Sequence, residues 1–99
     1  VIIYIIRRRK IMDYKQEGNK LRLEFKNLIY NFMKNSSDCQ NFSEGLRQSE
    51  IFRSCGMDWG EKQNATSSNQ QYWIVALLRE LEEENKIQRD NTNKKWRLR

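Results

Sequence analysis

Cationic side chains crowd the C-terminal end of this 99-residue chain. Lysine and arginine at such density neutralise the phosphates of a polyanion and displace its counterions. The stretch from 86 to 99 has one anion, Asp90, against six cations, namely Lys86, Arg89, Lys94, Lys95, Arg97 and Arg99. This imbalance favours nucleic-acid binding over catalysis as the chemistry of the segment.

An apolar-striped segment lies immediately upstream of the basic stretch. Its large aliphatic residues follow the i, i+3, i+4, i+7 spacing of one helix face, at Ile74, Leu77, Leu78 and Leu81. We expect this face to contact the core. The opposite face is then predicted to carry Gln71, Tyr72, Val75 and Arg79.

The start of this predicted helix has side chains suited to reading bases. Gln70 and Gln71 fall in its first turn, where a recognition helix meets base edges. Glutamine can bond adenine bidentately, and Val75 can touch a thymine methyl group. The alternative is that these side chains simply face solvent. The candidate DNA-binding residues are Gln70, Gln71, Tyr72, Val75, Arg79, Arg89, Lys94, Lys95 and Arg97.

The basic stretch itself has the pattern of a β-hairpin. Apolar Ile87, Trp96 and Leu98 flank a polar tip at 90–93. Trp96 alternates with cationic neighbours, so we expect it to pack beneath the hairpin while the cations neutralise phosphates. An acidic patch late in the helix would repel DNA and is expected to point away from it. Its members are Glu80, Glu82, Glu83 and Glu84.

The upstream half of the chain supplies the elements that must position the C-terminal ones. Residues 1–12 read as a strand and 13–19 as a linker. A helix is predicted over 20–34. Its core face should hold Leu21, Phe25, Leu28, Ile29, Phe32 and Met33. Its solvent face should hold Arg22, Glu24, Lys26 and Asn27.

A short second helix is predicted before a longer polar loop. Ser49 can cap it, Ile51, Phe52 and Cys55 can pack, and Gly56 can end it. Residues 57–68 then form a loop. The predicted fold class is mainly α with a small β-sheet: three helices, a C-terminal hairpin and an N-terminal strand. Residues 1–19 form the strand and linker, and residues 20–99 form the domain.

Two segments resemble winged helix-turn-helix DNA-binding domains. The stretch 46–56 is similar to their second helix, and 74–87 is similar to their third helix running into the wing. Asn85 stands where the family usually has glycine, and Leu46 can supply the short strand beside the wing. The resemblance covers residues 20–99, and the long loop 57–68 departs from the family's tight turn. It extends to modules fused to the C-terminal end of bacterial restriction endonucleases.

The resemblance implies a winged helix that binds double-stranded DNA. The third helix would enter the major groove and the wing would lie on the backbone. The domain would be the targeting module of a larger DNA-processing protein, for example in restriction-modification, and a homodimer is one option. The alternatives are a protein-interaction winged helix, docking through Tyr72, Trp73 and Val75, and a cytosolic juxtamembrane domain.

Composition narrows the remaining classes. The net charge of +6 favours polyanionic partners, and the lack of histidine removes the commonest general base and metal ligand. Glu24 and Lys26, downstream of Asp13, have the spacing of a metal-dependent nuclease, but a solvent-facing helix is the wrong support for that site. We therefore expect no enzyme, metal or cofactor here.

Cysteine usage and the N-terminal residues bear on location. Cys39 and Cys55 lack metal-ligand spacing and are expected to be idle thiols in a reducing compartment. The apolar run 1–6, followed by the cations of 7–10, is too short to span a membrane. The expected location is cytoplasmic, or nuclear in a eukaryote.

Overall fold

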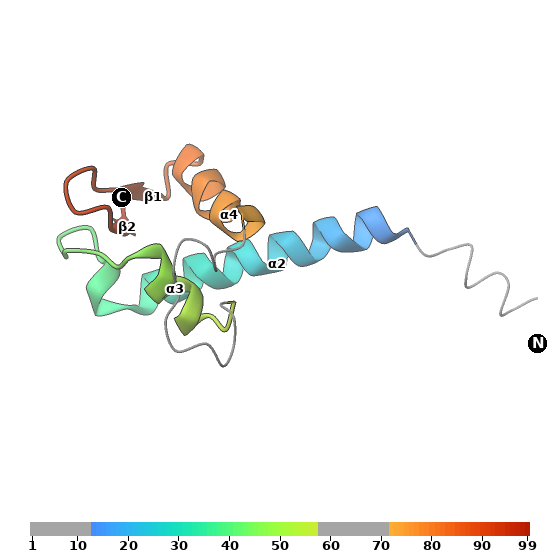
Figure 1. Ribbon diagram of the computed structural model, residues 1–99, viewed down its shortest axis with the longest axis horizontal. Coiled ribbons are helices and arrows are strands. Elements are labelled where there is room, and N and C mark those ends of the chain that lie inside the picture. The colour runs from blue at the N-terminus through green and yellow to red at the C-terminus, as the bar shows by residue number, and fades with distance from the viewer. Residues whose placement is uncertain (1–12, 58–71) are drawn as a thin grey trace, which may run out of the picture.

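The computed structural model describes residues 13–57 and 72–99, and the side chains from residue 75 onward in the second range. These residues form helices followed by a two-stranded antiparallel hairpin (Figure 1). The predicted class, mainly α with a small C-terminal sheet, is confirmed. In chain order the elements are α2 (Tyr14–Asn35), η1 (Ser37–Cys39), α3 (Gln48–Ser54), α4 (Tyr72–Glu83), β1 (Ile87–Arg89) and β2 (Trp96–Leu98).

The first helix begins earlier than the sequence pattern predicts. Asp13 is its N-cap, and the Asp13 carboxylate accepts a hydrogen bond from the backbone N–H of Gln16 at 3.1 Å. The segment 13–19 was predicted to be a linker, and this prediction is wrong because a good N-cap outweighs the cost of Gly18 within the helix. The boundary at residue 19 therefore falls inside α2. The predicted strand 1–12 lies outside the described residues.

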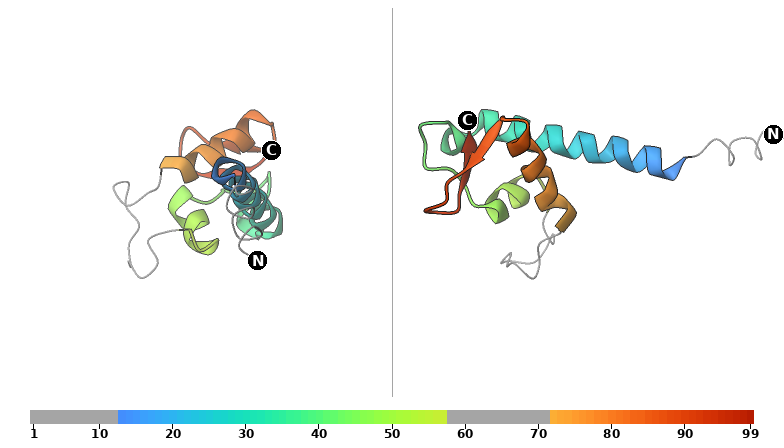
Figure 2. Two further views of the ribbon diagram at one scale, coloured as in Figure 1. Left: turned by 90° about the vertical axis from the view of Figure 1, so that its right-hand side faces the viewer. Right: turned by 90° about the horizontal axis from the view of Figure 1, so that it is seen from above.

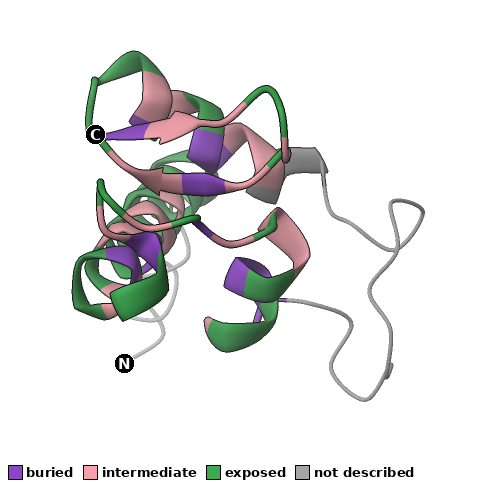
Figure 3. Cartoon of the chain, turned by 90° about the vertical axis from the view of Figure 1, so that its left-hand side faces the viewer, coloured by how far each residue is buried: buried purple, intermediate pink, exposed green. Residues whose placement is uncertain are grey.

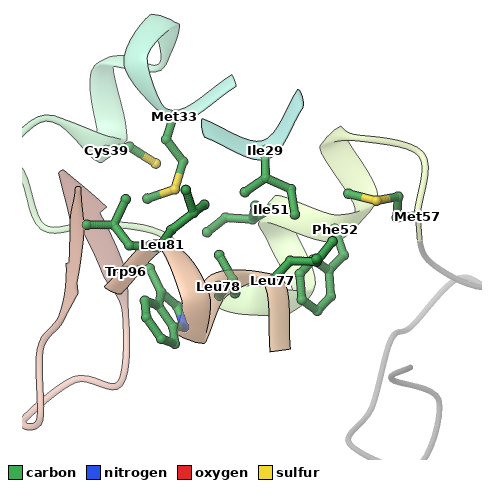
Figure 4. Close-up of a cluster of buried hydrophobic side chains, with 11 residues drawn as sticks. Ile29, Met33, Cys39, Ile51, Phe52, Met57, Leu77, Leu78, Leu81 and Trp96 are labelled. Carbon is green, nitrogen blue, oxygen red and sulfur yellow. The ribbon is translucent and has the colours of Figure 1, made fainter. Parts of the chain in front are cut away.

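One apolar core joins α2, α3, α4 and the hairpin. Leu77, Leu78 and Leu81 of α4 are buried, as their helical spacing predicts. Figure 4 shows them facing side chains of α2 and α3. The buried apolar residues are Ile29, Met33, Cys39, Ile51, Phe52, Met57, Leu77, Leu78, Leu81, Ile87 and Trp96.

The predicted core face of α2 is only partly correct. Ile29 and Met33 are buried, and Phe25 and Phe32 pack partly against the core. Leu21 and Leu28 remain 53% and 45% exposed, so their prediction as core residues is wrong. Each leucine precedes by one residue, and so by about 100° of helix rotation, a residue that faces the domain: Arg22, paired with α4, and Ile29, in the core. The leucines therefore lie on a side of α2 that is not fully covered, and the N-terminal part of α2 also projects beyond α3 and α4 (Figure 1).

The ends of α3 and α4 share one capping geometry. Gly56 and Asn85 adopt positive φ angles of 71° and 62°, as predicted. After α4, the N–H of Asn85 donates to Glu82 O and the N–H of Lys86 to Leu81 O, which is a Schellman motif. The start of α3 differs from the prediction. Its N-cap is Arg47, two residues before Ser49, and the backbone N–H of Arg47 donates to the Glu50 carboxylate at 2.9 Å.

The hairpin lies beside a third backbone segment. Arg89 pairs with Trp96 and Ile87 with Leu98 across β1 and β2. Leu46 exchanges two backbone hydrogen bonds with Trp96, at 2.8 and 2.9 Å, so the predicted role of Leu46 beside the wing is confirmed. Figures 2 and 3 show the hairpin against the rest of the domain, with its tip exposed. The start of β2, next to the hairpin tip, is thus fixed by the segment that precedes α3.

Gly45 permits the close approach of these two backbones. Its φ is +95°, and a Cβ built there would lie 2.6 Å from the carbonyl oxygen of Trp96. Gly56 also has a positive φ, but nothing lies within 4 Å of its ideal Cβ position. Comparing substitutions at the two glycines therefore distinguishes the cost of a positive φ from the cost of a direct backbone clash.

We predict that Gly45→Ala destabilises the domain more than Gly56→Ala does. The Gly56 change should cost about 1–2 kcal/mol, the usual cost of a left-handed conformation for an L-residue. The Gly45 change adds a backbone clash that only a shift of β2 can relieve. Urea denaturation of both variants measures the difference. Equal losses would show that the contact between Gly45 and Trp96 does not constrain the hairpin.

Candidate nucleic-acid interface

Trp96 brings the cation of α4 and a cation of the hairpin to one place. Its indole is 1% exposed. The guanidinium carbon of Arg79, on α4, lies 5.2 Å from the centroid of the ring, and that of Arg89, on β1, lies 6.0 Å from it. Cations at this distance are attracted to the aromatic quadrupole. Arg79, the one cation of α4, is thus held near Arg89 of the hairpin by their shared contact with Trp96.

The hairpin tip is organised by the single anion of the basic stretch. The Asp90 carboxylate accepts from the backbone N–H groups of Thr92, at 2.7 Å, and Asn93, at 3.3 Å. It also accepts from Nη1 of Arg97 at 3.1 Å. The Thr92 N–H, the Arg97 guanidinium and the Asn93 N–H lower the pKa of Asp90, in that order. Asp90 therefore remains ionised at neutral pH, and its charge is used within the turn.

Lys95 is paired with an acid that lies outside the hairpin. Its Nζ donates to Oε1 of Glu44 at 2.8 Å. This ammonium lowers the pKa of Glu44. The Lys95 side chain is 20% exposed and the Glu44 side chain is 71% exposed, so the pair lies at the surface. Lys95 thus reaches solvent with part of its charge already compensated.

Three cations of the basic stretch have no carboxylate partner among the described residues. These are Arg89, Lys94 and Arg99. Lys94 is exposed and has a φ of 64°, which sets it at the turn out of the tip. Lys86 differs, because its Nζ lies 3.2 Å from Oε1 of Glu84. Lys94 is exposed and has no carboxylate partner among the described residues, so it is the side chain of the tip best placed to contact a phosphate.

The acidic patch of α4 is paired mainly with α2. Arg22 donates to Glu80, and Lys26 Nζ lies 2.7 Å from Oε2 of Glu84 and 3.3 Å from Oε1 of Glu80. The prediction that Arg22 and Lys26 face solvent is therefore wrong: the Lys26 side chain is only 14% exposed. On the other flank, Glu82 accepts from Arg79 at 3.1 Å. These pairs reduce the repulsion that the patch would exert on a polyanion.

The predicted recognition face of α4 needs one correction. Val75, predicted to lie opposite the core, is half-buried and packs against it. It precedes Leu78 by three residues, and such residues share a helix face. Arg79 is exposed. Gln70 and Gln71 lie outside the described residues, as does the side chain of Tyr72, which begins α4.

The candidate nuclease residues have structural positions in α2. Asp13 caps the helix, and Lys26 is paired with the acids of α4. In the part of the chain that the structure describes, no three His, Cys, Asp or Glu side chains gather to hold a metal ion.

The two thiols are not joined to each other. Cys39 is buried, and Cys55 is half-buried. Burial raises the pKa of both, that of Cys55 to about 11. Both are therefore protonated at neutral pH, and a protonated thiol is a poor nucleophile.

Comparison with known proteins adds no relative to these observations. No protein-family model, curated protein or solved structure matches the chain. None of the helices in 13–57 and 72–99 combines the length and apolar character that a membrane crossing needs.

The contacts of two residues on this surface could not be predicted from the sequence. Glu44 is paired with a lysine 51 positions away. No spacing rule connects residues so distant, so only the fold shows that Lys95 is partly neutralised. Trp96 was expected under the hairpin, but its contact with Arg79 depends on how α4 crosses the hairpin. That crossing is set by the shared core.

We predict an acid-sensitive link between α2 and α4. Pairing with Arg22 and Lys26 lowers the pKa of Glu80 from 4.5, and pairing with Lys26 and Lys86 lowers that of Glu84. A lowered folded-state pKa gives stability that is present above the unfolded value and lost as pH falls through the folded value. The pKa of Lys26 is raised from 10.5, chiefly by Glu84, so its contribution is present below that pH and lost above it.

Urea midpoints measured from neutral pH down to about pH 3 should therefore fall, and less so in the Glu80→Gln/Glu84→Gln variant. The variant is less stable at neutral pH because it leaves Lys26 without an ionised partner. An acid limb as steep in the variant as in the wild type would assign the acid sensitivity to other carboxylates.

Proposed function

We propose that this domain binds double-stranded DNA as a winged helix-turn-helix, with α4 directed at the major groove and the β1–β2 hairpin on the phosphate backbone. The observation that carries the proposal is the joined basic surface around Trp96. Arg79 of α4 and Arg89 of β1 lie on the same indole, and Lys94 stands exposed at the hairpin tip.

The order of elements supports this assignment. Three helices precede a two-stranded hairpin, and a short segment at Leu46 pairs with β2. This is the arrangement that the resemblance to winged helices implies. The packing of Val75 on the core weighs against the alternative of an apolar protein-docking face on α4, because that face would need Val75 exposed.

Affinity and sequence specificity are assigned to different side chains. Arg89, Lys94 and Arg99 supply phosphate contacts that carry no sequence information. Arg97 and Lys95 add to them while bonded to Asp90 and Glu44. Base contacts are assigned, as the sequence predicts, to Tyr72, the first residue of α4, and to Gln70 and Gln71, which lie outside the described residues.

The proposal extends to the setting of the domain. A small binding module whose described residues gather no cluster of metal-ligating side chains suits the targeting part of a larger DNA-processing protein, as the resemblance to restriction-endonuclease modules implies. We propose a cytoplasmic location, or a nuclear one in a eukaryote, since DNA is the ligand.

We predict that duplex binding weakens steeply with salt and that Lys94→Asn reduces this dependence. Each phosphate contact contributes a slope of about −0.9 to log K against log salt, so three contacts give about −3 or steeper. Asparagine removes the charge and tolerates the left-handed φ of 64°. Fluorescence anisotropy at several salt concentrations should show a slope lower by about 0.9 for Lys94→Asn, on preferred and random duplexes alike.

A charge variant of opposite sign sharpens this experiment. Glu44→Gln releases Lys95 and removes an anion beside the hairpin, so it should strengthen binding. Glu24→Gln removes the same charge from an exposed position on α2 and is the control. An equal gain in both variants would indicate a net-charge effect alone. No binding at low salt, or a flat response to salt, would contradict DNA binding.

A further inference from the structure

Several large apolar side chains of α2 remain exposed. Tyr14 is 80% exposed, and Leu21 and Leu28 are 53% and 45% exposed. Two open hollows run along the same part of the helix, one lined by Leu21, Glu24, Phe25 and Leu28, the other by Gly18, Leu21, Arg22 and Phe25. Side chains at this spacing, with hollows between them, can receive knobs from a second helix.

The apolar positions of α2 follow a heptad repeat. Steps of four and three residues alternate along one stripe, through Tyr14, Gly18, Leu21, Phe25, Leu28 and Phe32. We call these six residues the α2 stripe. The C-terminal part of the stripe packs partly on the domain core, through Phe25 and Phe32. The N-terminal part extends past α4 and the hairpin, where a second helix can lie beside it (Figures 1 and 2).

The charges beside the stripe favour a second copy of the chain in parallel orientation as the partner. In this heptad, Leu21 and Leu28 take position d, and Gly18 and Phe25 take position a. The e positions hold Lys15, Arg22 and the buried Ile29, and the g positions hold Glu17, Glu24 and Asn31. When two copies run parallel and in register, Glu17 of one lies beside Arg22 of the other, twice by symmetry. When they run antiparallel, cations face cations and anions face anions.

Arg22 can serve both partners. It donates from Nη2 to Glu80 within its own chain, and its side chain remains 37% exposed. A guanidinium has five N–H donors in a fixed fork, so donors remain for the Glu17 of a second copy. The pairing that links α2 to α4 also holds this guanidinium beside the stripe, which reduces the entropy lost on association.

We propose that the α2 stripe is a self-association surface that binds a second copy of this chain as a parallel, in-register helix pair. The pairing covers Leu21 and Leu28 and places the two copies side by side, with the basic surfaces on bodies related by a twofold axis. It is independent of DNA binding, so either can fail while the other holds.

Matched leucine variants of the full chain test the surface. Leu21 lies in the stripe and Leu23 outside it, yet they are 53% and 52% exposed on the same helix. Sedimentation equilibrium over a range of protein concentrations, without DNA, should show a dimer for the wild type and for Leu23→Glu, and a monomer for Leu21→Glu. Unchanged circular dichroism in both variants would exclude unfolding as the cause.

A wild-type chain that is monomeric at every concentration would overturn the proposal. Loss of the dimer in both variants, or in neither, would also overturn it, because the stripe would then not be the contact.

Gly18 provides a gain-of-function arm. Nothing lies within 4 Å of a Cβ built at this stripe position. Alanine and leucine have nearly equal helix propensities. Gly18→Leu should therefore tighten the dimer relative to Gly18→Ala only where a second helix packs on the stripe. Equal dimer affinities for the two variants would contradict that packing.

Cysteine cross-linking tests the direction. Under oxidising conditions, Tyr14→Cys and Leu28→Cys should each form a covalent dimer that the wild type does not form. The two positions are about 21 Å apart along a helix, so antiparallel copies cannot bring both into contact with their own equivalents. Cross-linking at only one of them would rule out the parallel register.

Discussion

The buried indole of Trp96 is where the hairpin, α4 and the segment before α3 meet. Its backbone bridges to Leu46, and its ring lies near the guanidinium groups of Arg79 and Arg89. Burying a large aromatic side chain contributes about 1.5–3 kcal/mol, which is substantial for a core of this size. The hairpin is short, and an isolated two-stranded hairpin has marginal stability in water. Its position therefore depends on this anchor, and so does the basic surface that it presents.

Charge pairing determines which parts of that surface stay available. The acids of α4 are turned toward Arg22 and Lys26 of α2, while Asp90 and Glu44 are bonded to Arg97 and Lys95. Among the described cations without a carboxylate partner, Arg89, Lys94 and Arg99 lie in the basic stretch, Lys15, Lys20 and Lys34 lie on α2, and Arg47 precedes α3. The same ion pairs fix the crossing of α2 and α4.

Local signals in the sequence were sufficient for the elements of the C-terminal half. The spacing of Leu77, Leu78 and Leu81 gave the core face of α4, and Asn85 marked its left-handed end, because both depend on neighbouring residues. Long-range relations were not predictable. The exposure of Leu21 depends on which side of α2 the rest of the domain packs against, and the pairing of Glu44 with Lys95 depends on the hairpin's return to residue 46. The wrong prediction that Val75 faces away from the core had a local cause, because its three-residue spacing from Leu78 already placed it on the core face.

If α4 and the hairpin bind DNA as one surface around Trp96, residues of both should respond to a duplex together. An NMR titration of the isotopically labelled chain with a short DNA duplex, following backbone amides and the arginine side chains, measures this response. We expect the largest chemical-shift changes at Arg79, Arg89 and Lys94 together, with the projecting part of α2 unchanged. Changes confined to α2, or changes in the hairpin without Arg79, would contradict binding through one surface.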